Sequence, residues 1–277
     1  MYFLEKFITN RKIPKSLIDV NLKTDISWVR RLTASNPANT EELVNKLLID
    51  NRLPYNESAL SEKFSMSQFF QKDFYPISFY YLGMFTKLDE QYMCLPNLNM
   101  RSIFVDYFNE IYKIDVSTKY AELMAGFLAQ PDIPALFAGY WEFYLSQLPE
   151  AIFQKVNENF YRTTFFELCR QHLSRYFTFA VENSYAAGRT DLEFIGKYHT
   201  RFADLRFLLE FKYISNPRWK KMSGTGKGAI DRFQAPEADV NQLKTYAAQW
   251  KKEHPHAGNK SFLVYCIGNK GFRVFPV

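Results

Sequence analysis

The feature of this sequence that most constrains its fold is a stretch of three short predicted β-strands over residues 178–214. The first runs into Glu182, the second opens with Asp191, and the third ends in the tripeptide Glu210-Phe211-Lys212. Each predicted strand therefore carries charge at a point where a buried strand is expected to be apolar, and such charges need a structural or chemical reason.

Strand geometry predicts that three of these charges lie together. Side chains at positions i and i+2 share one face of a strand, so Glu210 and Lys212 point the same way while Phe211 points to the packed face. If the second and third strands pair antiparallel, Asp191 lies near the Glu210 end. Paired carboxylates suit Mg²⁺, and a nearby ammonium group helps to position or deprotonate an attacking water. The alternative is a surface ion pair between Glu210 and Lys212, which the apolar residues around them disfavour.

The run GRTD, then a hairpin, then LLEFK, resembles the PD-(D/E)XK nuclease superfamily. Within it, the closest resemblance is to the nuclease-type domain that follows a predicted AAA-ATPase-like domain in Bacteroides-type bacteria. The resemblance implies four site residues, namely Glu182, Asp191, Glu210 and Lys212. It also covers residues 241–246, where Gln242 stands on the helix that follows the core strands. Thr190 replaces the proline of the superfamily's name, as it does in the narrower family.

The expected roles follow from this resemblance and from the chemistry of the side chains. Asp191 and Glu210 would hold Mg²⁺ or Mn²⁺, and Lys212 would position or activate the hydrolytic water. Glu182 would support a second ion or orient the residues that bind the first. Gln242 would steer Lys212 or the scissile phosphate.

Basic residues next to these strands predict contacts with substrate phosphates. Between residues 201 and 232 there are eight Lys and Arg side chains against three Asp and Glu, and such an excess favours a polyanion. An ordinary solvated loop is the alternative. The candidate phosphate contacts are Arg189, Lys220, Lys221 and Lys227; Arg189 would equally pair with a carboxylate.

Composition is that of a globular protein with room for two modest domains. Of the 277 residues, 47% are hydrophobic, 23% charged and 18% aromatic. No apolar run approaches the ~20 residues that span a membrane, and no secretory signal opens the chain. The three cysteines predict neither a disulfide framework nor a zinc cluster. A cytoplasmic protein is the expectation.

The N-terminal half predicts a mainly helical domain, residues 1–148. Residues 66–112 follow the order helix, helix, hairpin, helix of a winged-helix-like unit, with Gly83 ending the second helix. Only Arg101 is basic in the last of these helices, so a lid or connector is expected in preference to DNA reading. A boundary at Leu148-Pro149 leaves residues 149–277 for a restriction-endonuclease-like α/β domain, a mixed sheet flanked by helices.

Residues 223–228 look like a phosphate-binding loop but depart from its pattern. The motif GxxxxGK[ST] requires glycine where Lys221 stands and Ser or Thr where Gly228 stands, and no strand leads straight into this segment. A flexible loop that closes over substrate is the preferred interpretation.

The sequence thus predicts a Mg²⁺-dependent nuclease whose partner is a nucleic acid. Two alternatives stay open. One is a non-catalytic binding or regulatory module of an AAA-ATPase-like protein, and the other is a winged-helix nucleic-acid binder with a structural C-terminal sheet. The resemblance also implies an upstream ATPase domain as a partner, although this chain contains no Walker motif.

Overall fold

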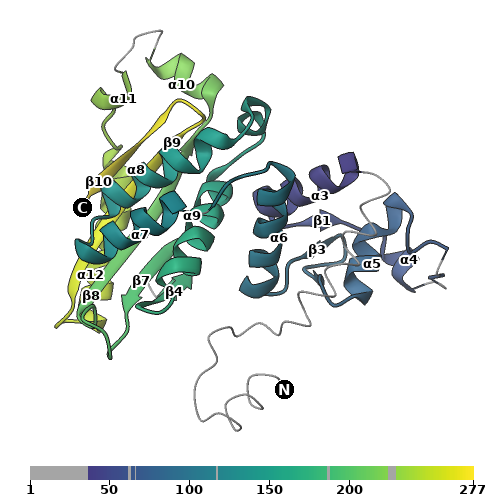
Figure 1. Ribbon diagram of the computed structural model, residues 1–277, viewed down its shortest axis with the longest axis horizontal. Helices are drawn as coiled ribbons and strands as arrows, with labels where there is room; N and C mark the ends of the chain where they lie inside the picture. Colours follow the sequence, from purple (N-terminus) through teal and green to yellow (C-terminus); the bar gives the residue numbers. More distant parts are fainter. Residues whose placement is uncertain (1–36, 62–63, 66, 117, 186–187, 224–228) are drawn as a thin grey trace. The chain divides into compact units, whose positions relative to one another are not determined.

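Figure 1 shows the computed structural model of the chain, which describes residues 37–61, 64–65, 67–116, 118–185, 188–223 and 229–277. The chain divides into two compact units, Met1–Ile111 and Tyr112–Val277. Within the described residues, no helix is both long enough and apolar enough to cross a membrane.

The first unit combines helices with a three-stranded sheet of order β1-β3-β2, in which both pairs are antiparallel. In chain order its main elements are α3 (Pro37–Asp50), β1 (Leu53–Pro54), α4 (Glu57–Ser61), α5 (Tyr75–Tyr81), β2 (Thr86–Lys87), β3 (Tyr92–Cys94) and α6 (Leu98–Ile111). The expected hairpin and the helices on either side of it are present, and Gly83 follows α5 with a left-handed φ of 72°. Residues 67–70 form a turn where a helix was expected, and β1 was not anticipated.

The second unit is a five-stranded mixed sheet flanked by helices. Its helices are α7 (Thr118–Ala129), α8 (Ile133–Phe143), α9 (Glu158–Leu173), α10 (Asn216–Ser223), α11 (Ala229–Arg232) and α12 (Glu237–Glu253). Its sheet strands are β4 (Phe177–Val181), β7 (Leu192–Gly196), β8 (Leu205–Ile214), β9 (Gly258–Ile267) and β10 (Gly271–Pro276), in the order β10-β9-β8-β7-β4. Strands β8 and β9 are parallel, and the other pairs are antiparallel. A separate hairpin of β5 (Ser184–Tyr185) and β6 (Gly188–Arg189) stands between β4 and β7.

Aromatic side chains build the core on one face of this sheet, across which Figure 1 shows α7, α8 and α9 stacked. The rings that meet there come from three helices and two central strands: Phe127, Phe137, Phe165, Phe194, Phe207 and Phe211. Helices α7 and α8 therefore pack with the sheet, and the structure divides the chain at residues 111/112. The boundary expected at Leu148-Pro149 lies inside the second unit.

Helix α12 covers the opposite face. Its Leu243 and Trp250 are fully buried in a cluster with Leu208 and Ile214 of β8 and with Leu263 of β9. The strict alternation along β8 thus sends odd-numbered side chains toward α9 and even-numbered ones toward α12. Glu210 and Lys212 are even-numbered, and their place in this pattern defines where a site can form.

Candidate active site

The register between β7 and β8 brings Asp191, just before β7, next to Glu210 within β8. Leu192 pairs with Leu209 in an antiparallel ladder, so Asp191 and Glu210 are the next residues along the two strands. Asp191 is also fixed to β8 directly, because its Oδ2 accepts a hydrogen bond of 2.8 Å from the backbone N–H of Phe211. The antiparallel pairing expected from the sequence is confirmed.

Glu210 and Lys212 form a largely buried pair. Lys212 Nζ lies 3.0 Å from Glu210 Oε1, and the two side chains are 22% and 6% exposed. An exposed surface ion pair is therefore excluded. The second carboxylate oxygen, Glu210 Oε2, is buried without a hydrogen-bond partner, which is costly for a carboxylate and leaves an acceptor available to a ligand.

Arg162 of α9 was not anticipated and occupies a central position. Its side chain is 7% exposed, and its guanidinium joins two of the expected site residues. Nη1 donates to Asp191 Oδ1 at 2.8 Å, and Nη2 donates to Glu182 Oε1 at 2.7 Å and to Asn159 Oδ1 at 2.7 Å. Glu182 Oε1 also accepts from the more exposed Arg189, at 3.3 Å.

A further unanticipated carboxylate, Glu158, begins α9 and faces the same charges. Burial raises the pKa of Glu158 to about 7, with the Asp191 carboxylate adding to the rise and Lys212 and Arg162 opposing it. Burial likewise raises the pKa of Glu210 to about 7, with Asp191 again adding to it. Burial alone would lower the pKa of Lys212, but the carboxylates around it, Glu210 foremost, outweigh this and raise it. The site therefore holds more negative charge than its own cations offset.

Glu193 is a fully buried carboxylate on the α12 face of β7. Its two oxygens accept hydrogen bonds from Thr190 Oγ1 at 2.6 Å and from Tyr185 Oη at 2.9 Å. The backbone N–H of Thr190 in turn donates to the carbonyl of Asn183 at 2.9 Å. Glu193 thus anchors both strands of the β5–β6 hairpin next to Asp191.

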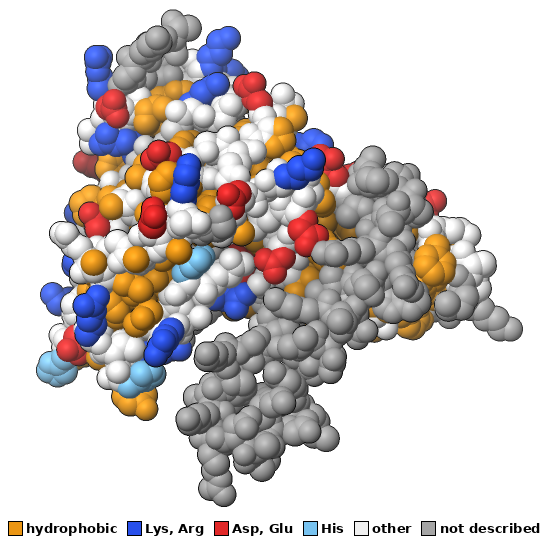
Figure 2. Space-filling model, in the orientation of Figure 1, with side chains coloured by type: hydrophobic (Ala, Val, Ile, Leu, Met, Phe, Trp, Pro, Cys, Tyr) orange, Lys and Arg blue, Asp and Glu red, His pale blue; other side chains and the backbone are white. Residues whose placement is uncertain are grey.

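The other site residues expected from the sequence are Gln242, Lys220, Lys221 and Lys227. Gln242 donates to Tyr246 Oη at 2.8 Å, and the described contacts include none between Gln242 and Lys212. Lys220 and Lys221 are exposed on α10, the helix that directly follows β8, whereas Lys227 lies outside the described residues. On the face drawn in Figure 2, Lys and Arg side chains are interspersed with Asp and Glu side chains, so the described residues form no continuous basic patch there.

The residues around Glu210 fit a divalent cation only in part. Among the described residues, no three His, Cys, Asp or Glu side chains are arranged as a formed metal site. The buried, unpartnered Oε2 of Glu210 and the raised pKa values of Glu158 and Glu210 nevertheless suit a hard cation, which takes oxygen ligands and favours ionised carboxylates. Glu182 fits less well because two arginines already occupy its Oε1.

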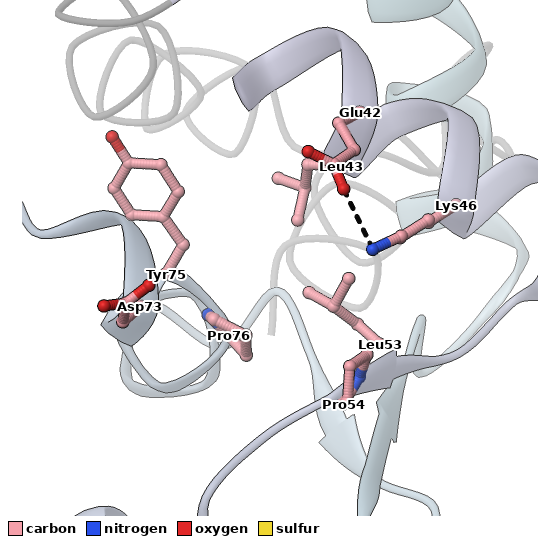
Figure 3. Close-up of a pocket in the computed structure, with 8 residues that line it drawn as sticks. All are labelled: Glu42, Leu43, Lys46, Leu53, Pro54, Asp73, Tyr75 and Pro76. Atoms are coloured by element: carbon pink, nitrogen blue, oxygen red, sulfur yellow. Dashed lines mark ion pairs between the residues drawn. The ribbon is translucent and has the colours of Figure 1, made fainter. Parts of the chain in front are cut away.

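A separate pocket of about 290 Å³ lies within the first unit (Figure 3). Leu43, Leu53 and Pro76 give it an apolar wall, and the Glu42–Lys46 ion pair of α3 stands at 3.0 Å among the lining residues. None of the site residues expected from the sequence lines this pocket, and it does not provide paired buried carboxylates.

A mixed sheet with helices on both faces, in which an Asp just before one strand lies beside a Glu-x-Lys within the next, defines a restriction-endonuclease-like domain. Residues 156–275, from just before α9 into β10, match the family model of the PD-(D/E)XK nuclease superfamily. Residues 156–275 are therefore similar to that superfamily. Comparisons with curated proteins and with solved structures gave no significant match.

Proposed function

We propose that the second unit is a metal-dependent nuclease that hydrolyses phosphodiester bonds in nucleic acid. The observation that carries the proposal is that Asp191, just before β7, lies beside Glu210 and Lys212 within the adjacent strand β8. These residues lie inside the stretch that matches a nuclease superfamily, and clustered, largely buried charges of this kind are typical of functional sites.

Asp191 and Glu210 would hold Mg²⁺ or Mn²⁺, and Glu158 would add a third carboxylate from α9. Glu210 offers an oxygen without a hydrogen-bond partner. When bound, the cation would polarise the scissile phosphate and lower the pKa of an attacking water. The hydrogen bond from the Phe211 backbone holds the Asp191 carboxylate on β8, so one ligand keeps its position before any metal arrives.

Lys212 would act on the water and on the charge that develops at phosphorus. Its ammonium group is tethered beside Glu210, which keeps it protonated and oriented toward the carboxylates. A protonated amine at this place offsets negative charge in the transition state. Arg189, Lys220 and Lys221 are exposed cations suited to neighbouring phosphates of the substrate.

Gln242 is proposed to position the site through Tyr246. The Gln242 amide donates to the Tyr246 hydroxyl group, and that hydroxyl group lies so close to Gly188 that an added Cβ would stand 2.6 Å from it. The α12 helix would in this way support the hairpin that precedes Asp191. For the first unit we propose the winged-helix-like connector expected from its helix–hairpin–helix order, next to an ATPase domain as partner.

The test combines cleavage with metal binding. The full chain is incubated with labelled single- and double-stranded DNA and RNA in Mg²⁺ or Mn²⁺, and the same ions are titrated calorimetrically. We expect Asp191→Ala and Glu210→Ala to lose cleavage by a factor of roughly 10² or more and to lose metal binding. Glu237→Ala, an exposed carboxylate of α12, is the matched control and should retain both.

The outcome separates the candidate classes. Cleavage and metal binding that vanish together in the two variants support the nuclease. A folded wild-type chain that binds no metal, even with oligonucleotide present, contradicts it and favours the regulatory module of an ATPase-like protein. Cleavage that persists in Asp191→Ala and Glu210→Ala would place the chemistry elsewhere in the chain.

A further inference from the structure

The buried Arg162 lies between two carboxylates of the candidate active site, those of Asp191 and Glu182. Arg162 comes from the middle of α9, and its side chain is 7% exposed. A guanidinium keeps its charge at all ordinary pH values, so its burial requires anionic partners. It finds them in Asp191 at 2.8 Å and Glu182 at 2.7 Å.

The hydrogen bonds are distributed unequally over the two carboxylates, with one on each oxygen of Asp191 and two on Oε1 of Glu182. Each oxygen of Asp191 accepts one hydrogen bond, from Arg162 and from the Phe211 backbone. A carboxylate oxygen has two lone pairs, so Asp191 retains capacity on both. Oε1 of Glu182, by contrast, accepts from Arg162 and Arg189 together.

The backbone supports the same division. Glu182 has a φ of 54°, in the left-handed region that non-glycine residues rarely adopt. This conformation turns the chain at the end of β4, and its backbone N–H donates to the carbonyl of Asp191 at 3.1 Å. An unfavourable backbone conformation persists only where surrounding contacts hold it, and at Glu182 these contacts include the ion pair with the buried Arg162.

We propose that Arg162 takes the place of a second divalent cation, so that the centre binds a single metal ion. Glu182 would then pair with Arg162, whereas Asp191, Glu210 and Glu158 would bind the metal ion. The inference rests on the proposed metal-dependent nuclease. It differs from the role expected for Glu182 from the sequence, where that residue was to support a second ion.

The experiment counts bound Mn²⁺ per full-length chain by titration calorimetry and, independently, by the loss of free-ion electron paramagnetic resonance signal. Wild type is expected to bind one ion. Arg162→Met, which exposes the carboxylate pair, is expected to bind two. Arg162→Lys keeps the positive charge and should stay at one. The double variant Arg162→Met/Glu182→Gln removes the second carboxylate together with the arginine and should also stay at one.

The results distinguish this inference from the proposed function. Two ions in wild type, or one ion in folded Arg162→Met, would overturn the inference and leave the nuclease intact. No ion in wild type would refute both. If Arg162→Met is unfolded without metal, millimolar Mn²⁺ should restore its fold, and a chain that stays unfolded counts against the inference.

Discussion

Glu210→Gln tests the electrostatics of the candidate site in the absence of metal and substrate. Burial and nearby carboxylates raise the pKa of Glu210 from 4.5 to about 7. A carboxyl group whose pKa is higher in the folded than in the unfolded protein contributes stability below pH 4.5. That contribution is lost as the pH rises through 7, because the folded protein must then hold a charge it disfavours.

The size of the effect follows from the shift. Moving the pKa of one group from 4.5 to about 7 corresponds to about 3 kcal/mol at pH 8 and to less than about 1 kcal/mol at pH 5. The shift already includes the attraction of Lys212. Glutamine keeps the shape of the side chain without its charge, so Glu210→Gln should be more stable than wild type at pH 8, by up to about 3 kcal/mol.

Urea denaturation in EDTA at pH 5 and pH 8, followed by tryptophan fluorescence, measures the difference. Three of the four tryptophans, Trp141, Trp219 and Trp250, lie in the second unit and report on its unfolding. Asp191→Asn is the control with the opposite sign. Its carboxylate accepts from Arg162 and from the Phe211 backbone, so its loss should cost about 2 kcal/mol or more at both pH values. The reasoning is refuted if Glu210→Gln is no more stable than wild type at pH 8. It is also refuted if the gain in unfolding free energy is as large at pH 5 as at pH 8.

Three further predictions concern single side chains of the second unit. Lys212→Met should abolish cleavage while Mn²⁺ binding by calorimetry survives, because the ammonium group is assigned to the water and not to the metal. Glu193→Ala should lower the free energy of unfolding by about 2–4 kcal/mol in urea, since the buried Thr190 hydroxyl and the half-buried Tyr185 hydroxyl lose their acceptor. Gly188→Ala should destabilise the chain by about 1–3 kcal/mol because its φ is 136° and the new Cβ would meet Tyr246. Adding Tyr246→Ala to Gly188→Ala should recover the steric part of that loss in thermal melts.

The strands and their relative positions were predictable because they depend on local patterns. Alternation with period two placed Glu210 and Lys212 on one side of β8, and the antiparallel pairing of β7 with β8, assumed as a condition, is observed. The mixed sheet with flanking helices was likewise expected and is confirmed. Nothing in the local sequence indicated that β9 returns parallel to β8, but helix α12 between these strands permits such a crossover.

The residues that the sequence did not reveal come from elements far away along the chain. Arg162 and Glu158 lie on α9, and no spacing rule links a helix residue to strands that follow it by 20 residues or more. A signal was present, however: Arg162 stands in the run Phe160 to Phe166, all of which is buried, and a buried arginine requires an anion. Glu193 carried a similar signal, since it falls between the buried residues Leu192 and Phe194.

The domain boundary depended on information that composition does not contain. Prolines at 131, 134 and 149 mark the ends of helices but not the unit on which a helix packs. Phe127 of α7 contacts Phe177, Phe194 and Phe207 of the sheet. Tertiary packing, and not the local sequence, decides which of the many aromatic residues make such contacts. Only the packed structure therefore places α7 and α8 with the sheet.

The charges of the site favour a bound divalent cation independently of any one contact. Four carboxylates, Glu158, Glu182, Asp191 and Glu210, meet two largely buried cations, Arg162 and Lys212. Four negative and two positive charges leave two negative charges when all groups are ionised. The exposed Arg189 is screened by solvent and offsets little of this. A bound Mg²⁺ or Mn²⁺ would offset this excess, to which Asp239 also contributes near Glu158. The raised pKa values of Glu158 and Glu210 express the same excess, because each carboxyl group resists ionisation until a cation is present.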